Sequence, residues 1–261
     1  MDSILSKRKI AAVAAEFLGT GVLAFVVLSV SRSQIGIPYF VAMAAGLAVV
    51  LLALGLNRDV QLNPALTLGL WTGRRIGTLK TLLFVAAQML GGFAAYELYK
   101  YFSRGPIQPL PTTFDAHILI AEAFGAFLFA FIAAGVAYQR QHWLVRAAAS
   151  GGGLTLGIIV ASAASAAFIN PAVALAANAW SWGTYVAGPV LGAIIGVNLY
   201  GLLFATRDKL VTAKAGTATT VASPVRGDDE VVVTERAERS EKVASKSAKT
   251  EKKAVKPKKK K

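Results

Sequence analysis

Two copies of a short motif, Asn63-Pro64-Ala65 and Asn170-Pro171-Ala172, have the clearest chemical potential in this sequence. Asn is a favoured N-cap and Pro is favoured at the first helical position, so each motif predicts the start of a helix. The Asn amides are hydrogen-bond donors, and a helix N-terminus carries roughly half a positive charge. Two such ends facing one another would donate hydrogen bonds to a small neutral molecule and disfavour cations.

Catalytic and metal chemistry have little support in the sequence. Cysteine is absent, which excludes a disulfide, a thiolate nucleophile and a cysteine-ligated metal. The two histidines, His117 and His142, are too few and too far apart for a zinc site. Because no nucleophile, acid–base pair or phosphate-binding loop is recognisable, we expect neither an enzyme nor a bound cofactor.

The elements that position the two motifs are apolar enough to lie in a membrane. Apolar residues make up 55% of the 261 residues and charged residues only 16%. A helix of about 20 apolar residues crosses the hydrocarbon core of a bilayer. Six spans are therefore predicted, over residues 10–30, 38–56, 79–102, 116–138, 144–168 and 185–205. Two shorter apolar stretches, 64–72 and 171–179, begin at the motifs and reach only about 13 Å each. Gly73 is suited to end the first of them in the left-handed conformation.

An internal repeat relates about residues 9–103 to about residues 115–205. Glu16 in the first span recurs as Glu122 at an offset of 106, and Asn63 recurs as Asn170 at an offset of 107. One copy holds three spans and a half-span, so the second copy must enter the membrane inverted. Inversion brings the two short helices together near the membrane midplane, where irregular backbone requires a lined cavity or pore.

Charge is distributed unevenly along the chain. Residues 207–261 hold 16 basic and 8 acidic residues, whereas the first 206 residues hold 12 and 6. Basic residues in the loops favour an orientation with both termini in the cytoplasm. We expect residues 1–206 to form the membrane domain and residues 207–261 to be a disordered Lys-rich cytoplasmic tail. The leading interpretation is a solvated tail. The alternatives are binding to anionic lipid headgroups and, less favoured, binding to nucleic acid.

These motifs resemble the aquaporin or major intrinsic protein family over about residues 9–205. The motifs that carry the resemblance are AEFLGT at 15–20, LNPALTLG at 62–69, AQ at 87–88 with LG at 90–91, NPA at 170–172 and GPVLGA at 188–193. The resemblance implies an all-α membrane protein with six transmembrane helices and two half-helices in an inverted internal repeat. It also implies a homotetramer with one pore in each subunit.

The resemblance bears on two carboxylates inside the spans, Glu16 and Glu122, which are costly there and so functional or structural. One interpretation is a proton relay. Their symmetric placement favours the other, which the resemblance also implies: each accepts hydrogen bonds from unpaired amides of a half-helix loop. Gln88 is expected to brace the same region.

The sequence departs from the family at the outer constriction of the pore. An Arg follows the second Asn-Pro-Ala motif in the family, and this chain has Val173 there. Carried over by alignment, the other constriction positions are Ala45, Ile158 and Ala167, so all four are apolar. Losing the guanidinium removes a fixed positive charge and several donors. Small side chains would widen the constriction, whereas a hydrophobic ring would hinder water by dewetting, and both effects stay open here. Gln61 stands where the family usually has His.

We therefore predict a passive channel for water or small uncharged solutes in the plasma or inner membrane, in contact with membrane lipid. Two alternatives remain from other classes: a non-conducting membrane scaffold with a basic tail, and an ion-leaky channel that lacks the usual Arg. The intact pair of Asn-Pro-Ala motifs favours a working pore over a scaffold.

Overall fold

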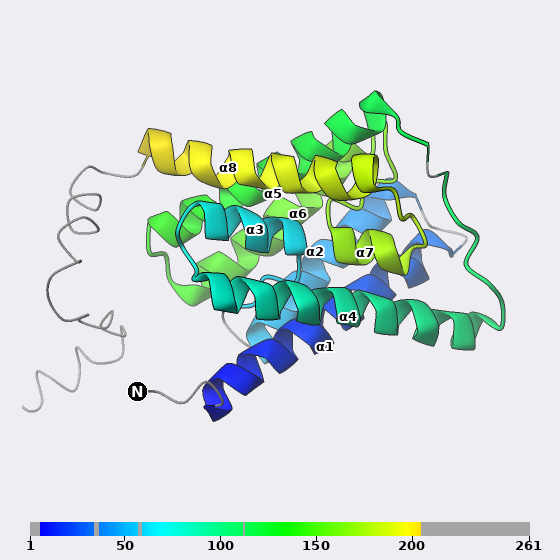
Figure 1. Ribbon diagram of the computed structural model, residues 1–261, viewed down its shortest axis with the longest axis horizontal. Helices are drawn as coiled ribbons and strands as arrows, with labels where there is room; N and C mark the ends of the chain where they lie inside the picture. The colour runs from blue at the N-terminus through cyan, green and yellow to red at the C-terminus, as the bar shows by residue number, and fades with distance from the viewer. Residues whose placement is uncertain (1–5, 34–36, 57–58, 112, 205–261) are drawn as a thin grey trace, which may run out of the picture. The chain divides into compact units, whose positions relative to one another are not determined.

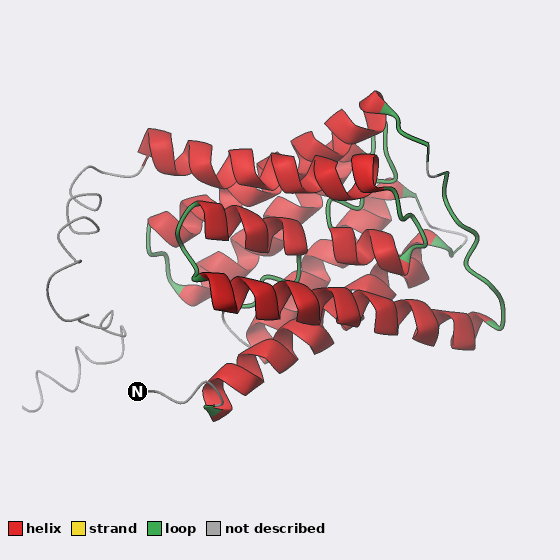
Figure 2. Cartoon of the chain, in the orientation of Figure 1, coloured by secondary structure: helices red, strands yellow, loops and turns green. Residues whose placement is uncertain are grey.

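The computed structural model describes residues 6–33, 37–56, 59–111 and 113–204, and every regular element in these ranges is a helix (Figure 2). The helices are α1 (Lys7–Ser31), α2 (Pro38–Gly55), α3 (Pro64–Thr72), α4 (Thr78–Ser103), α5 (Ala116–Tyr138), α6 (Trp143–Ala161), α7 (Pro171–Ala176) and α8 (Gly188–Phe204). A π-helical segment, Trp182–Ala187, leads directly into α8. Residues 1–206 form one compact unit. The expected Lys-rich tail, residues 207–261, lies outside the described residues.

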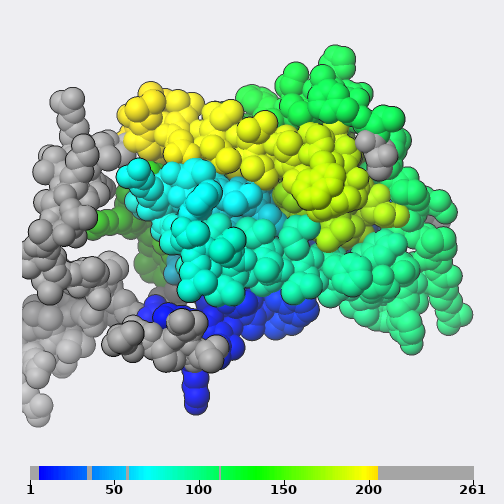
Figure 3. Space-filling view, in the orientation of Figure 1, coloured from blue at the N-terminus to red at the C-terminus, as the bar shows by residue number. Residues whose placement is uncertain are grey.

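Six helices of the described ranges are long and apolar enough to cross a membrane, which confirms the predicted number of spans. In five of these six, only 39% of the residues in the most apolar stretch are buried. The rest of that apolar surface faces outward, where lipid or another subunit would cover it. Figure 3 shows one such face, on which α3, α4 and α8 lie close together. Leu82 of α4 and Leu202 of α8, for example, are 64% and 80% exposed.

The two copies of the repeat pack in a crossed pattern. Within each copy the first and last spans pack together, α1 on α4 and α5 on α8. The half-helices pack mainly on the other copy, α3 on α8 and α7 on α4. Figure 1 shows α3 and α7 arranged end to end between α8 and α4. This crossing brings the N-termini of the two half-helices to the same level of the bundle.

Glycines allow the long helices to approach closely. A Cβ added at Gly192 in α8 would lie 1.9 Å from the backbone oxygen of Ala123 in α5. A Cβ added at Gly46 in α2 would lie 2.6 Å from the backbone oxygen of Gly151 in α6. Small residues at such crossings are typical of helices that pack in membranes.

The end of α6 corrects the sequence expectation, which continued this span to residue 168. The helix ends at Ala161, and the chain then forms a loop that runs to Asn170. Ala167 and Ile169 take positive φ angles of 57° and 43°, which no helix tolerates. The loop is nevertheless apolar, because it passes through the centre of the bundle.

Two further helix ends differ from expectation. The second half-helix ends at Ala176, not at residue 179, because Asn178 adopts a φ of 57° and its side chain donates a hydrogen bond to the carbonyl of Ile107 (2.8 Å). The first half-helix does end at Gly73, but the left-handed residue there is Arg74, with a φ of 57°.

Candidate functional site

Each Asn-Pro-Ala motif caps a half-helix. The side-chain oxygen of Asn63 accepts hydrogen bonds from the backbone amides of Ala65 (2.8 Å) and Leu66 (3.4 Å). The side-chain oxygen of Asn170 accepts one from the amide of Ala172 (3.0 Å). Pro64 and Pro171 occupy the first helical positions, where the missing N–H removes no hydrogen bond. Both helices therefore begin at an Asn whose oxygen is turned into its own helix.

The amide nitrogens of the two Asn side chains connect the repeats. Asn63 Nδ2 donates to the carbonyl of Ile169 at 2.9 Å, and Asn170 Nδ2 donates to the carbonyl of Leu62 at 2.8 Å. Each acceptor directly precedes the other Asn in the sequence. An amide carries two N–H groups, so this exchange uses one from each Asn and leaves the second for another acceptor. The sequence did not indicate that half of these donors hold the two loops together.

Glu16 holds the loop that leads into α3. The carboxylate is 1% exposed and accepts hydrogen bonds from the backbone amides of Gln61 and Leu62, both at 2.8 Å. Gln88 of α4 donates a third hydrogen bond to it, also at 2.8 Å, and accepts one from Thr67 of α3 (3.2 Å). This network links α1, α4 and the half-helix.

Glu122 holds the equivalent loop before α7, with a different set of partners. It accepts hydrogen bonds from the amides of Phe168 (3.0 Å) and Ile169 (2.6 Å) and from the hydroxyl of Ser165. The Ser165 hydroxyl also accepts the amide of Ala167 at 2.9 Å. Ser165 was not among the residues singled out from the sequence, because nothing in its neighbourhood marks it as different from the other small residues there.

These contacts fix where the carbonyls of the two loops point. A trans peptide is planar, with N–H and C=O pointing in opposite directions. An N–H that faces a buried carboxylate therefore turns the carbonyl of the same peptide unit away from it. The carbonyls turned in this way belong to Val60, Gln61, Ala167 and Phe168, and all four residues line a cavity.

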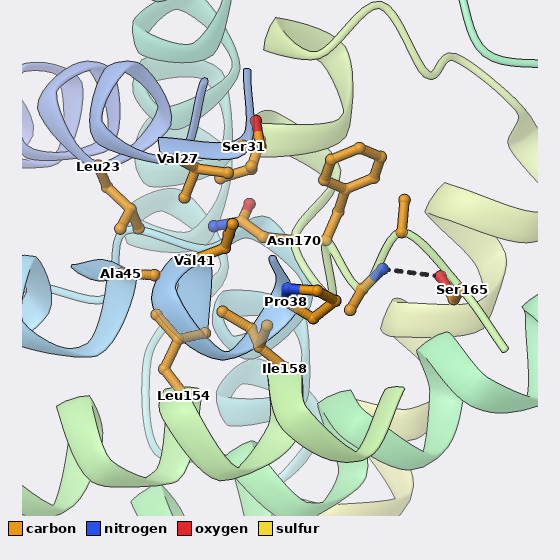
Figure 4. Close-up of a pocket in the computed structure, with 14 residues that line it drawn as sticks. Leu23, Val27, Ser31, Pro38, Val41, Ala45, Leu154, Ile158, Ser165 and Asn170 are labelled. Atoms are coloured by element: carbon orange, nitrogen blue, oxygen red, sulfur yellow. Dashed lines mark hydrogen bonds between the residues drawn. The ribbon is translucent and has the colours of Figure 1, made fainter. Parts of the chain in front are cut away.

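One of these cavities, which we call the filter cavity, has a volume of about 190 Å³ and contains all four predicted constriction residues. It lies between α1, α2, α6, the loop before α7, and α7 itself (Figure 4). Its lining is Leu23, Val27, Ser31, Pro38, Val41, Ala45, Leu154, Ile158, Ser165, Ala166, Ala167, Phe168, Asn170 and Val173. No charged residue is in this set.

The polar side chains of the filter cavity are largely occupied. Ser165 donates to Glu122, as described above, and Ser31 donates to the carbonyl of Leu28 in its own helix (3.3 Å). Asn170 has one N–H engaged with Leu62. What remains for a ligand is therefore the second N–H of Asn170 together with the carbonyls of the loop, in an otherwise apolar space.

Comparison with known proteins decides the family. The profile of the family described as Major intrinsic protein matches residues 3–117. Aquaporin NIP1-1 of Zea mays is 31% identical over 226 residues, which cover 79% of this chain and 79% of that protein. This chain belongs to the major intrinsic protein family. Aquaporin Z of Photorhabdus laumondii subsp. laumondii is 29% identical, and that match covers 74% of this chain and 97% of that protein.

A solved structure supports the fold of this major intrinsic protein. The aquaglyceroporin from Plasmodium falciparum superposes with a TM-score of 0.62 and 19% sequence identity, covering 80% of this chain and 100% of that one. The all-helical architecture with six spans is therefore the fold of the family.

A second cavity, which we call the Gln61 cavity, opens at the other end of the half-helix pair and has a volume of about 300 Å³. Its lining is Val49, Ala53, Asp59, Val60, Gln61, Leu66, Leu70, Arg75, Ile76, Lys80, Ala133, Val136, Ala137, Arg146, Ala147 and Ser150. The side-chain oxygen of Gln61 is buried and has no hydrogen-bond partner among the described residues. The described ranges contain no group of three or more His, Cys, Asp or Glu that could hold a metal ion.

Proposed function

We propose that this major intrinsic protein is a passive membrane channel for water and small uncharged solutes. The observation that carries the proposal is the reciprocal pair of hydrogen bonds between Asn63 and Ile169 and between Asn170 and Leu62. It fixes two half-helix N-termini against one another, each with an amide N–H to spare. Since both helix ends are positive, a neutral acceptor is favoured at this point and a cation is not.

A permeating molecule would meet donors and acceptors in sequence. Carbonyls held by Glu122 line the filter cavity, the two Asn amides follow, and carbonyls held by Glu16 line the Gln61 cavity. Molecules that both donate and accept hydrogen bonds, such as water, glycerol and urea, suit this order. The family consists of channels, and we propose accordingly that the chain is not an enzyme.

We further propose that Ala45, Ile158, Ala167 and Val173 form the constriction. All four are at most 4% exposed and all line the filter cavity. Because none of the four carries a charge, the constriction selects solutes by their size and by how little free energy they lose beside apolar side chains. Solutes with a hydrocarbon face, such as glycerol, would then lose less than water does on entering it.

Orientation in the membrane, oligomeric state and the tail complete the proposal. We propose that both termini are cytoplasmic and that the end bearing the Gln61 cavity, lined by Arg75, Lys80 and Arg146, is the cytoplasmic one, because basic residues are enriched on that side of a membrane. The protein lies in the plasma or inner membrane as a homotetramer, and the exposed apolar faces of its spans contact lipid or neighbouring subunits. Anionic lipid is the proposed ligand of residues 207–261. The comparisons support neither a scaffold nor an ion-leaky channel.

Stopped-flow light scattering on proteoliposomes tests the channel directly. Reconstituted protein should pass water, glycerol or urea faster than empty liposomes of the same composition. Permeation no faster than through the empty liposomes for all three solutes would replace the channel with the scaffold.

The absence of cysteine makes the constriction testable by a single thiol. Ala167→Cys places the thiol in the filter cavity, whereas Ala163→Cys places it at an exposed position of the same loop. A thiol-specific reagent should block flux through the first variant and leave the second unaffected. Equal block, or none in either, would remove Ala167 from the constriction.

A further inference from the structure

The two cavities differ in charge. The filter cavity has no charged residue in its lining, while the Gln61 cavity has four: Asp59, Arg75, Lys80 and Arg146. Every formal charge that lines either cavity thus lies at one end of the proposed path. Three of the four are positive.

Arg75 is held at this end by contacts that leave its charge unneutralised. Its Nη2 donates to the backbone carbonyl of Ala137 at 3.2 Å, and its guanidinium carbon lies 4.2 Å from the centre of the Tyr138 ring. Both contacts are with the last turn of α5, where the helix dipole favours a cation. A guanidinium has five N–H donors, so four are not used by this hydrogen bond.

Lys80 contributes the second positive charge. Its Nζ lies 4.8 Å from the centre of the Phe84 ring, and it interacts electrostatically with the buried Glu16. Glu16 is 1% exposed and does not line the cavity, so Lys80 is the member of this pair that lines it. Within the described ranges, neither Arg75 nor Lys80 forms an ion pair.

The other two charges largely cancel. Arg146 of α6 is paired with Asp59 in the loop after α2. The lining of the Gln61 cavity therefore keeps a net charge of two positive units, carried by Arg75 and Lys80. Low-dielectric walls around a cleft lined by one sign of charge focus its field on the cleft.

We propose that Arg75 and Lys80 form a charge filter at the cytoplasmic mouth of this channel, which turns small cations away before the half-helices do. The inference rests on the proposed channel function and adds to it the location of charge selection. Size and polarity are selected in the filter cavity, and charge is selected first in the Gln61 cavity and again at the N-termini of the half-helices. Arg75 and Lys80 would repel a cation at the mouth, before it reaches the half-helices.

The size of the effect follows from Coulomb's law. Two unit charges about 8 Å apart, in a medium with an effective dielectric constant of about 20, interact strongly enough that removing one changes cation entry roughly thirtyfold. At physiological salt the Debye length is also about 8 Å, which reduces the effect to about threefold to fourfold. Each neutralised residue should therefore raise cation entry by a factor between these limits, and more at low salt.

The experiment compares the ratio of cation flux to neutral-solute flux in proteoliposomes. Proton flux is followed with a pH-sensitive dye and urea and water flux by light scattering, on the same vesicles. Arg75→Gln, Lys80→Gln and the double variant should raise the ratio of proton flux to neutral-solute flux at least threefold. Arg75→Lys should restore it towards the wild-type ratio. Arg140→Gln is the matched control, since Arg140 is exposed, carries the same charge and does not line the cavity.

The outcomes separate this inference from the channel itself. If the wild-type protein passes no neutral solute, the proposed function fails. If it does pass one but the neutralised variants keep the wild-type ratio, the charge filter alone is overturned. The same holds if Arg140→Gln raises the ratio as much as Arg75→Gln does, because net charge and not position would then matter.

A measurement on the unmodified protein guards against variants that fail to fold. Raising the concentration of an impermeant salt should screen Arg75 and Lys80 and raise proton flux through the wild-type channel relative to urea flux. A ratio that stays constant between low and high salt contradicts the proposal without any substitution.

Discussion

Two equivalent carboxylates, Glu16 and Glu122, each accept backbone amides of the loop before a half-helix, but their side-chain partners differ. Glu16 receives its side-chain hydrogen bond from Gln88 on a neighbouring helix, whereas Glu122 receives it from Ser165 in the loop that it holds. In this part of the repeat the offset is 101, since Leu90-Gly91 recurs as Leu191-Gly192. Pro189 therefore stands where the first copy has Gln88, and Pro has no side-chain donor. Ser165, in the loop before α7, therefore supplies the side-chain hydrogen-bond donor that Gln88 supplies in the first copy.

Ser165→Ala tests this bracing role. The change removes one donor from Glu122 and leaves the amide of Ala167 without its acceptor, so about 1–3 kcal/mol of stability should be lost. Ser165→Thr keeps the hydroxyl and should restore most of it. Thermal unfolding in detergent gives the comparison.

Ser162→Ala is the matched control, because the Ser162 hydroxyl bonds only the carbonyl of Ile159 in its own helix (2.7 Å) and should cost about 0.5 kcal/mol or less. Equal destabilisation by both Ser-to-Ala changes would argue against a special role for Ser165. Flux through Ser165→Ala should fall as well, since the loop carbonyls it orients line the filter cavity.

Val173→Arg tests the constriction at the scale of one residue. Val173 is 3% exposed and lines the filter cavity, so the new side chain should enter the cavity and add a positive donor group to it. Glycerol and urea flux should fall about tenfold more than water flux, because a narrower opening discriminates by size. The readout is the ratio of glycerol to water permeability in wild type and variant.

Val173→Met adds length without charge and separates the two effects. An unpaired buried charge costs about 3–5 kcal/mol, so the folded state of Val173→Arg must be verified first. If the well-folded variant keeps the wild-type glycerol-to-water ratio, Val173 does not line the constriction.

At the scale of the helices, apolar length and motif position predicted most of what the structure contains. Six spans and two half-helix starts follow from runs of about 20 apolar residues and from the two Asn-Pro-Ala motifs. The end of α6 did not follow, because the apolar run continues past Ala161 while the helix does not. That end is set by Glu122, which is far away in the sequence and draws the amides of Phe168 and Ile169 out of any helical pattern.

The sequence predicted the paired motifs of the site but not the contacts that join them. Spacing within the repeat paired Asn63 with Asn170, but it could not show that each amide binds the loop of the other copy. Arg75 and Lys80 gave no signal as pore residues, since loop arginines and lysines are ordinary in a membrane protein. Only the packing of the α3–α4 connection against the end of α5 brings Arg75 to the Gln61 cavity.

Helix contact through glycine is testable with a matched pair. Gly192→Ala would place a Cβ 1.9 Å from the carbonyl oxygen of Ala123, and backbone cannot yield without separating α8 from α5. We expect a loss of about 3 kcal/mol or more, or failure to assemble. Gly152→Ala in α6 has nothing within 4 Å and should instead be neutral or stabilising by up to about 1 kcal/mol. Similar unfolding temperatures for the two variants would show that α5 and α8 are not in such close contact.

At the scale of the whole molecule, all the described residues that line the two cavities or hold their loops belong to one compact unit. Both half-helices, both cavities, Glu16, Glu122 and the charged residues of the Gln61 cavity belong to residues 1–206. The polar composition of residues 207–261, with 16 basic and 8 acidic residues, offers little apolar surface to bury. We therefore propose that conduction belongs to residues 1–206 and that lipid binding belongs to residues 207–261.

Deletion of residues 211–261 tests that division. The truncated protein should fold, form the same oligomer and conduct water and urea within about twofold of the full chain, because no element of the pore is removed. It should also bind vesicles less tightly when they contain anionic lipid, since each basic residue near such a surface contributes about 1 kcal/mol. Size-exclusion chromatography, stopped-flow scattering and vesicle flotation measure these three properties. A truncated protein that loses its oligomer or its flux would assign the tail a structural role, and unchanged flotation with anionic vesicles would remove lipid as its ligand.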